Sequence, residues 1–414
     1  MDTSTSNTAP RRVMYLENGI GYGGAAICLR HLVRNLDPQR YEALVVTGRD
    51  GPNYREIANE AKWQHIADRH LDVVGARRKL DAARWPDRLP GLRWLAGQVL
   101  ARSDDLFNFL PFFFGLLWSA LRYRPHLIHA NNDTLCNRAI LLVGRLLRIP
   151  SIAHIRGEAK GTPMLAATFK LPNYFVCVSN WISDDIGRHG VPQQKREVVY
   201  DGIALDDMNT EADGDKFRKT HGIPESAFAV GLVGLIIPWK GQELFLDAAA
   251  RLLPKYPDIY MLMVGGTPDD CRPFEKELRE RVGRESWGNR IRFTGHLNGM
   301  SEAYNGLDVP VSASTSPEPL GTMVIETMAM GRPLIAPNHG GGAEMNEHEK
   351  TALLFEPRNA DSLAECIERL YLDRELGRRL GEAARAKALA TFDVHTHAER
   401  IQAVYDRLLT GEIG

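Results

Sequence analysis

The chain has 414 residues, more than one hydrophobic core usually serves, so its length predicts two domains. Its 51 basic and 52 acidic residues nearly cancel, whereas general nucleic-acid-binding proteins more often carry a basic excess. The five cysteines include no C-x-x-C pair, which argues against a disulfide scaffold or structural zinc and favours a reducing cytoplasm. Residues 1–10 are polar and lack the apolar core of a signal peptide, so we expect a disordered lead-in.

Strand and helix patterns alternate through the first half of the chain. Apolar runs predict strands at residues 12–17, 42–47, 127–130, 151–156, 174–179 and 197–200. Helical periodicity lies between them at residues 25–36, 135–147 and 180–189. Such alternation is typical of a parallel sheet with helices on both faces.

A glycine-rich loop follows the first predicted strand. Gly19, Gly21 and Gly24 have the G-x-G-x-x-G spacing of dinucleotide-binding loops. That fingerprint also needs an acidic residue at the end of the second strand, and here Asp50 comes late, inside a loop. A nicotinamide-dependent oxidoreductase using the loop from Gly19 to Gly24 therefore stays a second hypothesis.

An aromatic and apolar segment runs from Phe107 to Leu121. It is interrupted by Pro111 and Gly115, and we expect it to be too short to cross a bilayer. One interpretation is a core helix packed on the first sheet. The other is an interfacial segment that contacts a membrane, because arginines flank it; they are Arg84, Arg88, Arg93, Arg102, Arg122 and Arg124. One helix can do both, with a different face for each.

Residues 205–216 are polar and acidic without apolar periodicity, and we place a linker there. Strand patterns then resume at residues 229–234, 260–264, 291–294, 308–314, 334–336 and 352–355. A helical tail covers residues 361–409 and is interrupted near residue 392. The expected division is therefore a lead-in (1–10), two α/β domains (11–205 and 206–391) and a terminal helix (392–414).

The most informative stretch covers residues 316–326. A buried strand precedes it, and the helical pattern after Gly321 ends at Gly331. Pro319 suits the first turn of that helix, whose free N–H groups would attract phosphate. Glu318 and Glu326 repel phosphate, so their expected partners are hydroxyl groups such as those of sugars. Phosphate donors between two hydroxyl acceptors predict a sugar-nucleotide pocket.

This E-P-x-G-x-x-x-x-E pattern resembles that of the retaining glycosyltransferases of family 4, of the bacterial polysaccharide and lipopolysaccharide type. The resemblance implies the GT-B fold, an α/β fold with two Rossmann-like parallel-sheet domains facing a cleft. It also implies a C-terminal helix that crosses back to the N-terminal domain. The first domain would bind the acceptor and the second the nucleotide-sugar donor.

The resemblance also assigns residues in the second domain. Lys240 would hold the donor diphosphate, although Leu235 stands where relatives have an arginine. Leu297 would lie beside the nucleobase, and Gly341 belongs to a loop near the transferred sugar. The remaining donor-binding residues would be Glu318, Leu320, Gly321, Thr322 and Glu326.

In the first domain, the resemblance places Gly23 and Gly24 at the cleft, where backbone can approach donor phosphates or acceptor. A strand-end residue would point at the sugar, and both His154 and Arg156 fit that position. Lys240, Glu318, His154 and Arg156 are the catalytic candidates. The sequence shows no obvious carboxylate nucleophile on this face, and no metal or cofactor is expected.

The predicted enzyme moves a hexose from a UDP-sugar or GDP-sugar to a hydroxyl acceptor, with retention of anomeric configuration. The acceptor would be a glycan or lipid-linked sugar of cell-surface polysaccharide, with no nucleic-acid partner. We expect the protein in the cytoplasm, peripheral on the inner face of the membrane through the segment from Phe107 to Leu121. A non-catalytic nucleotide-sugar binder is a third hypothesis.

Overall fold

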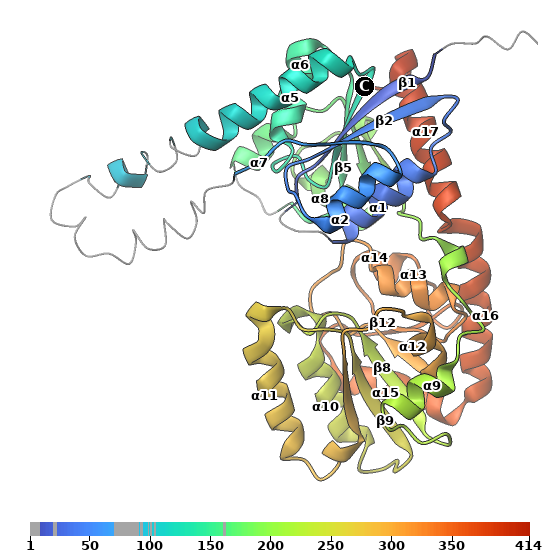
Figure 1. The fold of residues 1–414 in the computed structure, drawn as a ribbon. Helices are drawn as coiled ribbons and strands as arrows, with labels where there is room; N and C mark the ends of the chain where they lie inside the picture. Colours follow the sequence, from blue (N-terminus) through green and yellow to red (C-terminus); the bar gives the residue numbers. More distant parts are fainter. Residues whose placement is uncertain are drawn as a thin grey trace, which may run out of the picture. The chain divides into compact units, whose positions relative to one another are not determined.

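The computed structural model describes residues 9–19, 23–69, 91, 94–97, 99, 102, 105–159 and 163–414. The lead-in before residue 9, Gly21, and the arginines at 84, 88 and 93 lie outside the described residues. The chain forms two compact units (Figure 1). Unit 1 comprises Met1–Cys177, Ser183–Val199 and Ala398–Gly414, and unit 2 comprises Val178–Ile182 and Tyr200–His397. The residues expected to form a linker, 205–216, belong to unit 2.

The described part of unit 1 contains a seven-stranded parallel sheet of order β3-β2-β1-β4-β5-β6-β7. Its strands are β1 (Arg11–Glu17), β2 (Tyr41–Thr47), β3 (Lys62–His65), β4 (Leu127–Asn131), β5 (Ser151–Ile155), β6 (Tyr174–Cys177) and β7 (Arg196–Val198). The helices associated with it are α1 (Gly24–Arg34), α2 (Pro52–Arg55), the π-helical turn η3 (Asp105–Phe109), α5 (Leu110–Tyr123), α6 (Arg138–Leu147), α7 (Pro163–Thr168), α8 (Asn180–Arg188) and α17 (Val394–Thr410).

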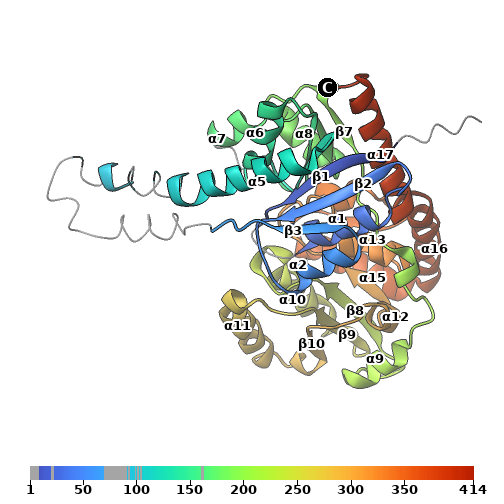
Figure 2. The same cartoon turned by 45° about the horizontal axis from the view of Figure 1, so that its top comes forward.

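Alternate residues of β1 serve two different cores, as the period of a strand requires. Val13 and Tyr15 pack with α1 and α17 on one face of the sheet, while Met14 and Leu16 pack with α5 and α6 on the other. Figure 2 shows these helices on opposite sides of β1 and β2. Burial on both faces explains why the strand is almost continuously apolar.

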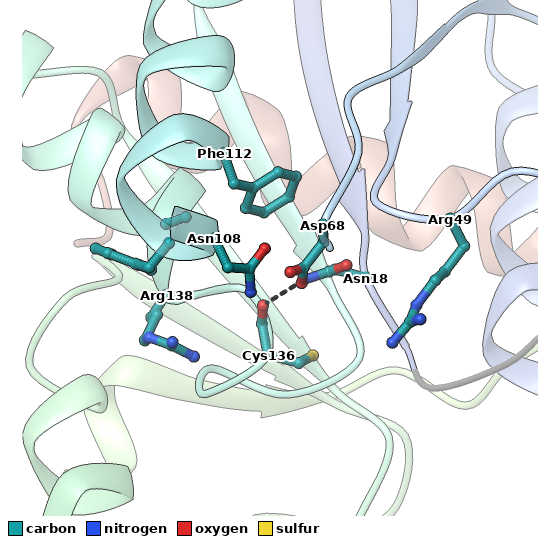
Figure 3. A pocket seen from close by; sticks show the side chains of 9 residues that line it. Asn18, Arg49, Asp68, Asn108, Phe112, Cys136 and Arg138 are labelled. Carbon is teal, nitrogen blue, oxygen red and sulfur yellow. Dashed lines mark hydrogen bonds between the residues drawn. The ribbon is translucent and has the colours of Figure 1, made fainter. Parts of the chain in front are cut away.

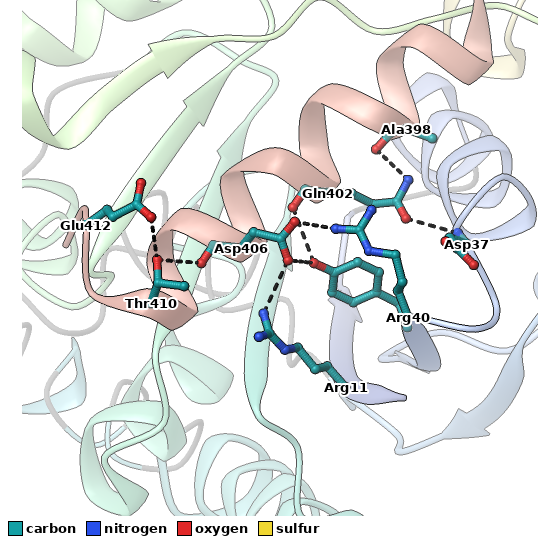
Figure 4. Close-up of polar contacts among 9 residues, drawn as sticks. Arg11, Asp37, Arg40, Ala398, Gln402, Asp406, Thr410 and Glu412 are labelled. Atoms are coloured by element: carbon teal, nitrogen blue, oxygen red, sulfur yellow. Dashed lines mark hydrogen bonds and ion pairs between the residues drawn. The ribbon is translucent and has the colours of Figure 1, made fainter. Parts of the chain in front are cut away.

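The terminal helix α17 is part of unit 1 from Ala398 onward. The Tyr405 hydroxyl lies 3.0 Å from that of Tyr15 and 2.7 Å from Nδ1 of His129. On the exposed side, Asp406 accepts a hydrogen bond from the Tyr41 hydroxyl at 2.5 Å and pairs with Arg11 and Arg40 (Figure 4). These contacts confirm that the end of the chain packs on the N-terminal sheet.

The described part of unit 2 contains a six-stranded parallel sheet of order β10-β9-β8-β11-β12-β13. Its strands are β8 (Phe228–Val233), β9 (Ile259–Val264), β10 (Ile291–Gly295), β11 (Val309–Val311), β12 (Ile335–Pro337) and β13 (Leu353–Phe355). Its helices are α9 (Gly214–Thr220), η6 (Pro238–Lys240), α10 (Gln242–Leu252), α11 (Arg272–Gly283), α12 (Ser301–Gly306), α13 (Thr322–Ala329), α14 (Gly340–Glu344), α15 (Ala360–Leu372) and α16 (Arg374–Thr391).

Both sheets reverse their strand order once. The reversal lies between β1 and β4 in unit 1 and between β8 and β11 in unit 2. In open α/β sheets, ligands bind at such switch points, beyond the carboxyl ends of the strands. The loops after these four strands are therefore the places to look for a site.

Candidate active site

In unit 2, the loops after β8 and β11 meet through an ion pair. Lys240 Nζ lies 2.7 Å from Glu318 Oε2, and the two side chains are only 16% and 14% exposed. The Ser314 hydroxyl also donates to Glu318. Two residues that the sequence assigned to phosphate and sugar are thus brought together, with the lysine charge countered by the carboxylate.

Neighbouring residues hold Lys240 in place. Its ammonium lies 4.7 Å from the centre of the Trp239 ring, a cation–π distance. Its aliphatic stem passes Gly234, where an added Cβ would lie 3.6 Å from Lys240 Cδ. Leu235 is exposed beside this turn and adds no charge, so the cation of this loop is Lys240 alone.

The helix after the motif begins at Thr322, directly after Gly321. The expectation that Pro319 occupies its first turn is wrong. Gly321 enters the helix with φ of +90°, a left-handed conformation that suits glycine, and Pro319 stays in the loop before it. Leu320 is buried, while Thr322 is exposed at the mouth of the helix. The Val324 N–H donates to the Gly321 carbonyl oxygen at 2.9 Å, whereas the N–H groups before it precede the first intrahelical bond and are available to an anion.

Glu326 lies one turn further along α13. The Tyr304 hydroxyl donates to its carboxylate at 2.6 Å. Burial raises the pKa of Glu326 above its ordinary value, and the Tyr304 hydrogen bond partly opposes that rise. The carboxylate therefore has one fixed donor and capacity to accept others.

The glycine-rich segment of α14 packs against the loop of Glu318. The Gly341 N–H donates to the Glu318 carbonyl oxygen at 2.8 Å. A Cβ at Gly340 would lie 2.8 Å from the Glu318 nitrogen, and one at Gly341 would lie 2.3 Å from the Pro319 oxygen. These two glycines are thus needed for backbone packing that positions Glu318, whereas the sequence favoured close approach of a ligand. Leu297, the predicted nucleobase contact, is half-buried in the loop after β10, the edge strand.

At the switch point of unit 1, Glu17 and Asn131 are directly paired in the β1–β4 register. The Asn131 amide donates to the Glu17 carboxylate, which also accepts from the Gly19 N–H at 3.0 Å. Burial raises the pKa of Glu17, and those two hydrogen bonds counter part of the rise. Glu17 is therefore a buried carboxylate at this switch point that the sequence pattern did not single out. The available signal was an acidic residue ending an apolar strand just before a glycine-rich loop.

His154 and Arg156 lie beside this pair. Arg156 donates through Nε to Asn131 Oδ1 at 3.1 Å, and its Nη2 lies 3.4 Å from Nδ1 of His154. His154 is fully buried, whereas Arg156 is partly exposed. A Cβ at Gly23 or Gly24 would meet no described atom within 4 Å, so the packing of the described chain does not require these glycines.

Within the described ranges, no group of three His, Cys, Asp or Glu side chains could hold a metal ion. The polar groups gathered at the two switch points are instead a lysine–glutamate pair, helix N–H groups and buried carboxylates. Such groups suit binding of a diphosphate and of hydroxyls.

Comparison with known proteins agrees with this architecture. Residues 22–207 match the family model described as Glycosyltransferase Family 4, and residues 213–387 match that described as Glycosyl transferases group 1. A solved structure of Anabaena HepE in complex with UDP and glucose aligns over 96% of this chain and 99% of its own, with a TM-score of 0.77 and 21% identity. A glycosyltransferase structure from Rickettsia africae gives a TM-score of 0.80 at 18% identity, covering 97% and 99% of the two chains. These likenesses show the fold, which is GT-B.

Among curated proteins, the chain is 30% identical over 226 residues to YtcC of Bacillus subtilis, named as a glycosyltransferase, covering 52% of this chain. It is 28% identical over 214 residues, 51% of this chain, to the lipopolysaccharide core biosynthesis mannosyltransferase LpsB of Rhizobium meliloti. The matches span 55% and 61% of the lengths of these relatives. With two adjoining family models and this fold, the chain belongs to the family 4 glycosyltransferases, as the sequence motif predicted.

Proposed function

We propose that this chain is a retaining, metal-independent hexosyltransferase that moves a sugar from a nucleoside diphosphate to a hydroxyl acceptor. The observation that carries the proposal is the Lys240–Glu318 pair at the switch point of unit 2, directly before α13. A cation, open helix N–H groups and two carboxylates are the set that a sugar nucleotide needs.

The bond to be broken joins the anomeric carbon to the β-phosphate, so negative charge develops on phosphate oxygen. Lys240 and the N–H groups at the start of α13 are suited to stabilise that charge. The lysine is paired with Glu318 before donor binds, so phosphate would compete for it. Glu318 then becomes free to hold sugar hydroxyls, and Glu326 holds those of the ribose.

Retention requires either a protein nucleophile or attack on the same face as departure. Glu17 is the buried carboxylate nearest to the glycine loop, but two hydrogen bonds already hold it and burial favours its neutral form. These properties make a poor nucleophile. We therefore favour front-side attack, in which the departing phosphate takes the acceptor proton.

The acceptor is a glycan or lipid-linked sugar of cell-surface polysaccharide, reached at the inner face of the cytoplasmic membrane. The support is a stripe on one face of η3 and α5, the membrane stripe: Leu106, Phe107, Leu110, Phe114, Trp118 and Leu121 are all exposed. Their spacing follows the helical period, and Arg102, Arg122 and Arg124 flank them. Basic residues beside an apolar stripe fit an anionic lipid surface.

The opposite face of α5 lies in the core, where Phe112, Leu116 and Ala120 pack on the sheet. Among the described helices, Leu106–Tyr123 alone has the length and composition to cross a membrane, which the sequence pattern did not predict, and 28% of that window is buried. Core helices of soluble domains pass the same test. The packed face therefore favours surface contact over spanning.

The function is tested by a screen of nucleotide sugars, including UDP-glucose and GDP-mannose, for slow hydrolysis by the purified chain. We expect one donor to be consumed, with the sugar released in its original anomeric form. If the chain binds one of the nucleotide sugars but hydrolyses none of them, it is a non-catalytic nucleotide-sugar binder. Binding of NADH in preference to every donor would instead favour the oxidoreductase hypothesis.

A further inference from the structure

A pocket lined by both polar and apolar side chains lies beyond the carboxyl ends of four neighbouring strands of unit 1. Asn18 follows β1, Arg49 follows β2, Asp68 follows β3, and Arg138 opens the helix after β4. The cavity holds about 100 Å³, several water volumes, which suits a small substituent with part of a sugar ring better than an oligosaccharide. Figure 3 shows the side chains of this pocket converging from separate segments.

Two arginines at this pocket are not neutralised by any described carboxylate. Arg49 has a buried Nε with no hydrogen-bond partner in the part of the chain that the structure describes. Arg138 donates to the Leu135 carbonyl at 3.1 Å and lies 4.8 Å from the centre of the Phe109 ring. Within the described ranges, neither guanidinium has a carboxylate at ion-pair distance, and the Asp68 carboxylate accepts from the Asn18 amide at 2.7 Å. Partly buried guanidinium groups of this kind favour an anion that binds in a bidentate manner.

The remaining lining suits a sugar. Phe109 and Phe112 offer aromatic surface, and Asn18 and Asn108 contribute amides. The Asn18 Oδ1 is buried without a partner among the described residues. A Cβ at Gly48 would lie 1.9 Å from that oxygen, so a glycine there leaves room for the amide. Amide groups with aromatic faces are a common combination for binding the hydroxyls and the apolar face of a sugar.

The pocket also adjoins the membrane stripe. Asn108, Phe109 and Phe112 line the cavity, while Phe107 and Leu110, interleaved with them in the sequence, are exposed. The change from the π-helical turn η3 to α5 occurs within this run, and such turns are frequent at functional sites. One short segment therefore lines the cavity on one side and presents an apolar surface on the other.

We propose that this pocket binds an anionic sugar of the acceptor, with Arg49 and Arg138 holding a phosphate or carboxylate group and the aromatic side chains contacting the ring. The lipid part of the same acceptor would remain in the bilayer against the membrane stripe. Naming this ligand an acceptor rests on the proposed function, whereas its anionic saccharide chemistry rests on the pocket alone.

The test is calorimetric titration of the full chain with glucose 6-phosphate, inorganic phosphate and glucose. The pocket should bind glucose 6-phosphate at least tenfold tighter than either fragment. The double variant Arg49→Gln/Arg138→Gln should lose at least tenfold of that affinity. A matched double variant, Arg145→Gln/Arg148→Gln, removes two arginines at the other end of α6 and should bind like the parent.

Three results would overturn the proposal. Equal binding by both double variants would mean that the pocket is not the site. Loss of binding in Lys240→Gln instead would place the anion in unit 2. If inorganic phosphate binds as tightly as glucose 6-phosphate, the pocket recognises the phosphate group alone and does not bind the sugar. The titration tests the pocket alone, because it needs no turnover. Hydrolysis of the donor is measured separately and tests the proposed function.

Discussion

The two switch points differ in how their charges are arranged. In unit 2, Lys240 and Glu318 form a close pair, and both follow from one short motif and one neighbouring loop. In unit 1, Asn18, Arg49 and Asp68 follow different strands, and Arg49 and Arg138 have no ion-pair partner in the described structure. Under the proposed function, Glu318 would occupy Lys240 until the diphosphate of the donor displaces it. The pocket of unit 1 instead presents its cations to an anionic ligand from the start.

The largest expected effect comes from removing the cation of unit 2. Lys240→Ala should lower donor turnover about 10²- to 10³-fold, because it removes the side chain that faces the developing phosphate charge. Circular dichroism should show an intact fold, because the residue ends the short helix η6 and lies outside the sheet core of unit 2. Lys255→Ala, an exposed lysine of the same unit, is the control. Turnover within threefold of the parent would contradict the assignment.

A smaller loss, about tenfold to a hundredfold in turnover, is expected for Glu318→Gln. The amide keeps the shape but gives up the charge that pairs with Lys240. UDP should therefore bind at least as tightly as to the parent while sugar transfer falls. Calorimetry with UDP and a turnover assay separate the two effects. Weaker UDP binding would show that the ion pair assembles the site and does not compete with the ligand.

Membrane association should fall about tenfold when Phe107, Phe114 and Trp118 are together replaced by serine. These side chains are 65%, 58% and 68% exposed, so the core of unit 1 should be unaffected. Flotation with vesicles containing phosphatidylglycerol measures the effect. Serine at Leu372 and Leu389, exposed apolar residues of unit 2, provides the control. If the parent and the triple variant float equally with the vesicles, the membrane stripe does not contact the lipid surface.

The smallest effect concerns Glu326, whose pKa is raised by burial. A carboxyl with a raised folded-state pKa stabilises the fold below its ordinary pKa, and that contribution is lost as pH rises through the raised value. Glu326→Gln should therefore raise the free energy of unfolding at pH 8 by about 1 kcal/mol and change it little at pH 4. The affinity for UDP should fall in the variant, because the carboxylate is lost. In the parent it should fall as the pH drops, because Glu326 is then protonated. Denaturant titrations at the two pH values measure the first effect, and equal stability changes would contradict it.

Much of the fold was predictable because strand and helix periods alternate clearly along both halves of the chain. The strand, loop and helix around residues 316–326 were also predictable, because the apolar strand, Gly321 and the helical period follow one another in one stretch. The donor-binding role of these residues stays a prediction. Glu17 was missed because an acidic residue at the end of a strand usually lies in solvent, and only the register with Asn131 reveals its burial. Arg49 follows a predicted strand and Arg138 falls in a predicted helix, 135–147, and they line one pocket only because β2 and β4 flank β1.

The local placement of Pro319 was wrong for a similar reason. A proline before an apolar period is compatible with a helix start, but the positive φ of Gly321 and the packing of Gly341 against Pro319 keep this proline in the loop. Tertiary contact decides the helix boundary there, and no pattern within the motif records it.

The central claim is best tested by an experimental structure of the chain with UDP or GDP bound. We expect the diphosphate to contact Lys240 Nζ and the N–H groups at the start of α13, with the ribose hydroxyls at Glu326. A nucleotide bound at the glycine loop of unit 1, or anywhere away from Gly321, would contradict it.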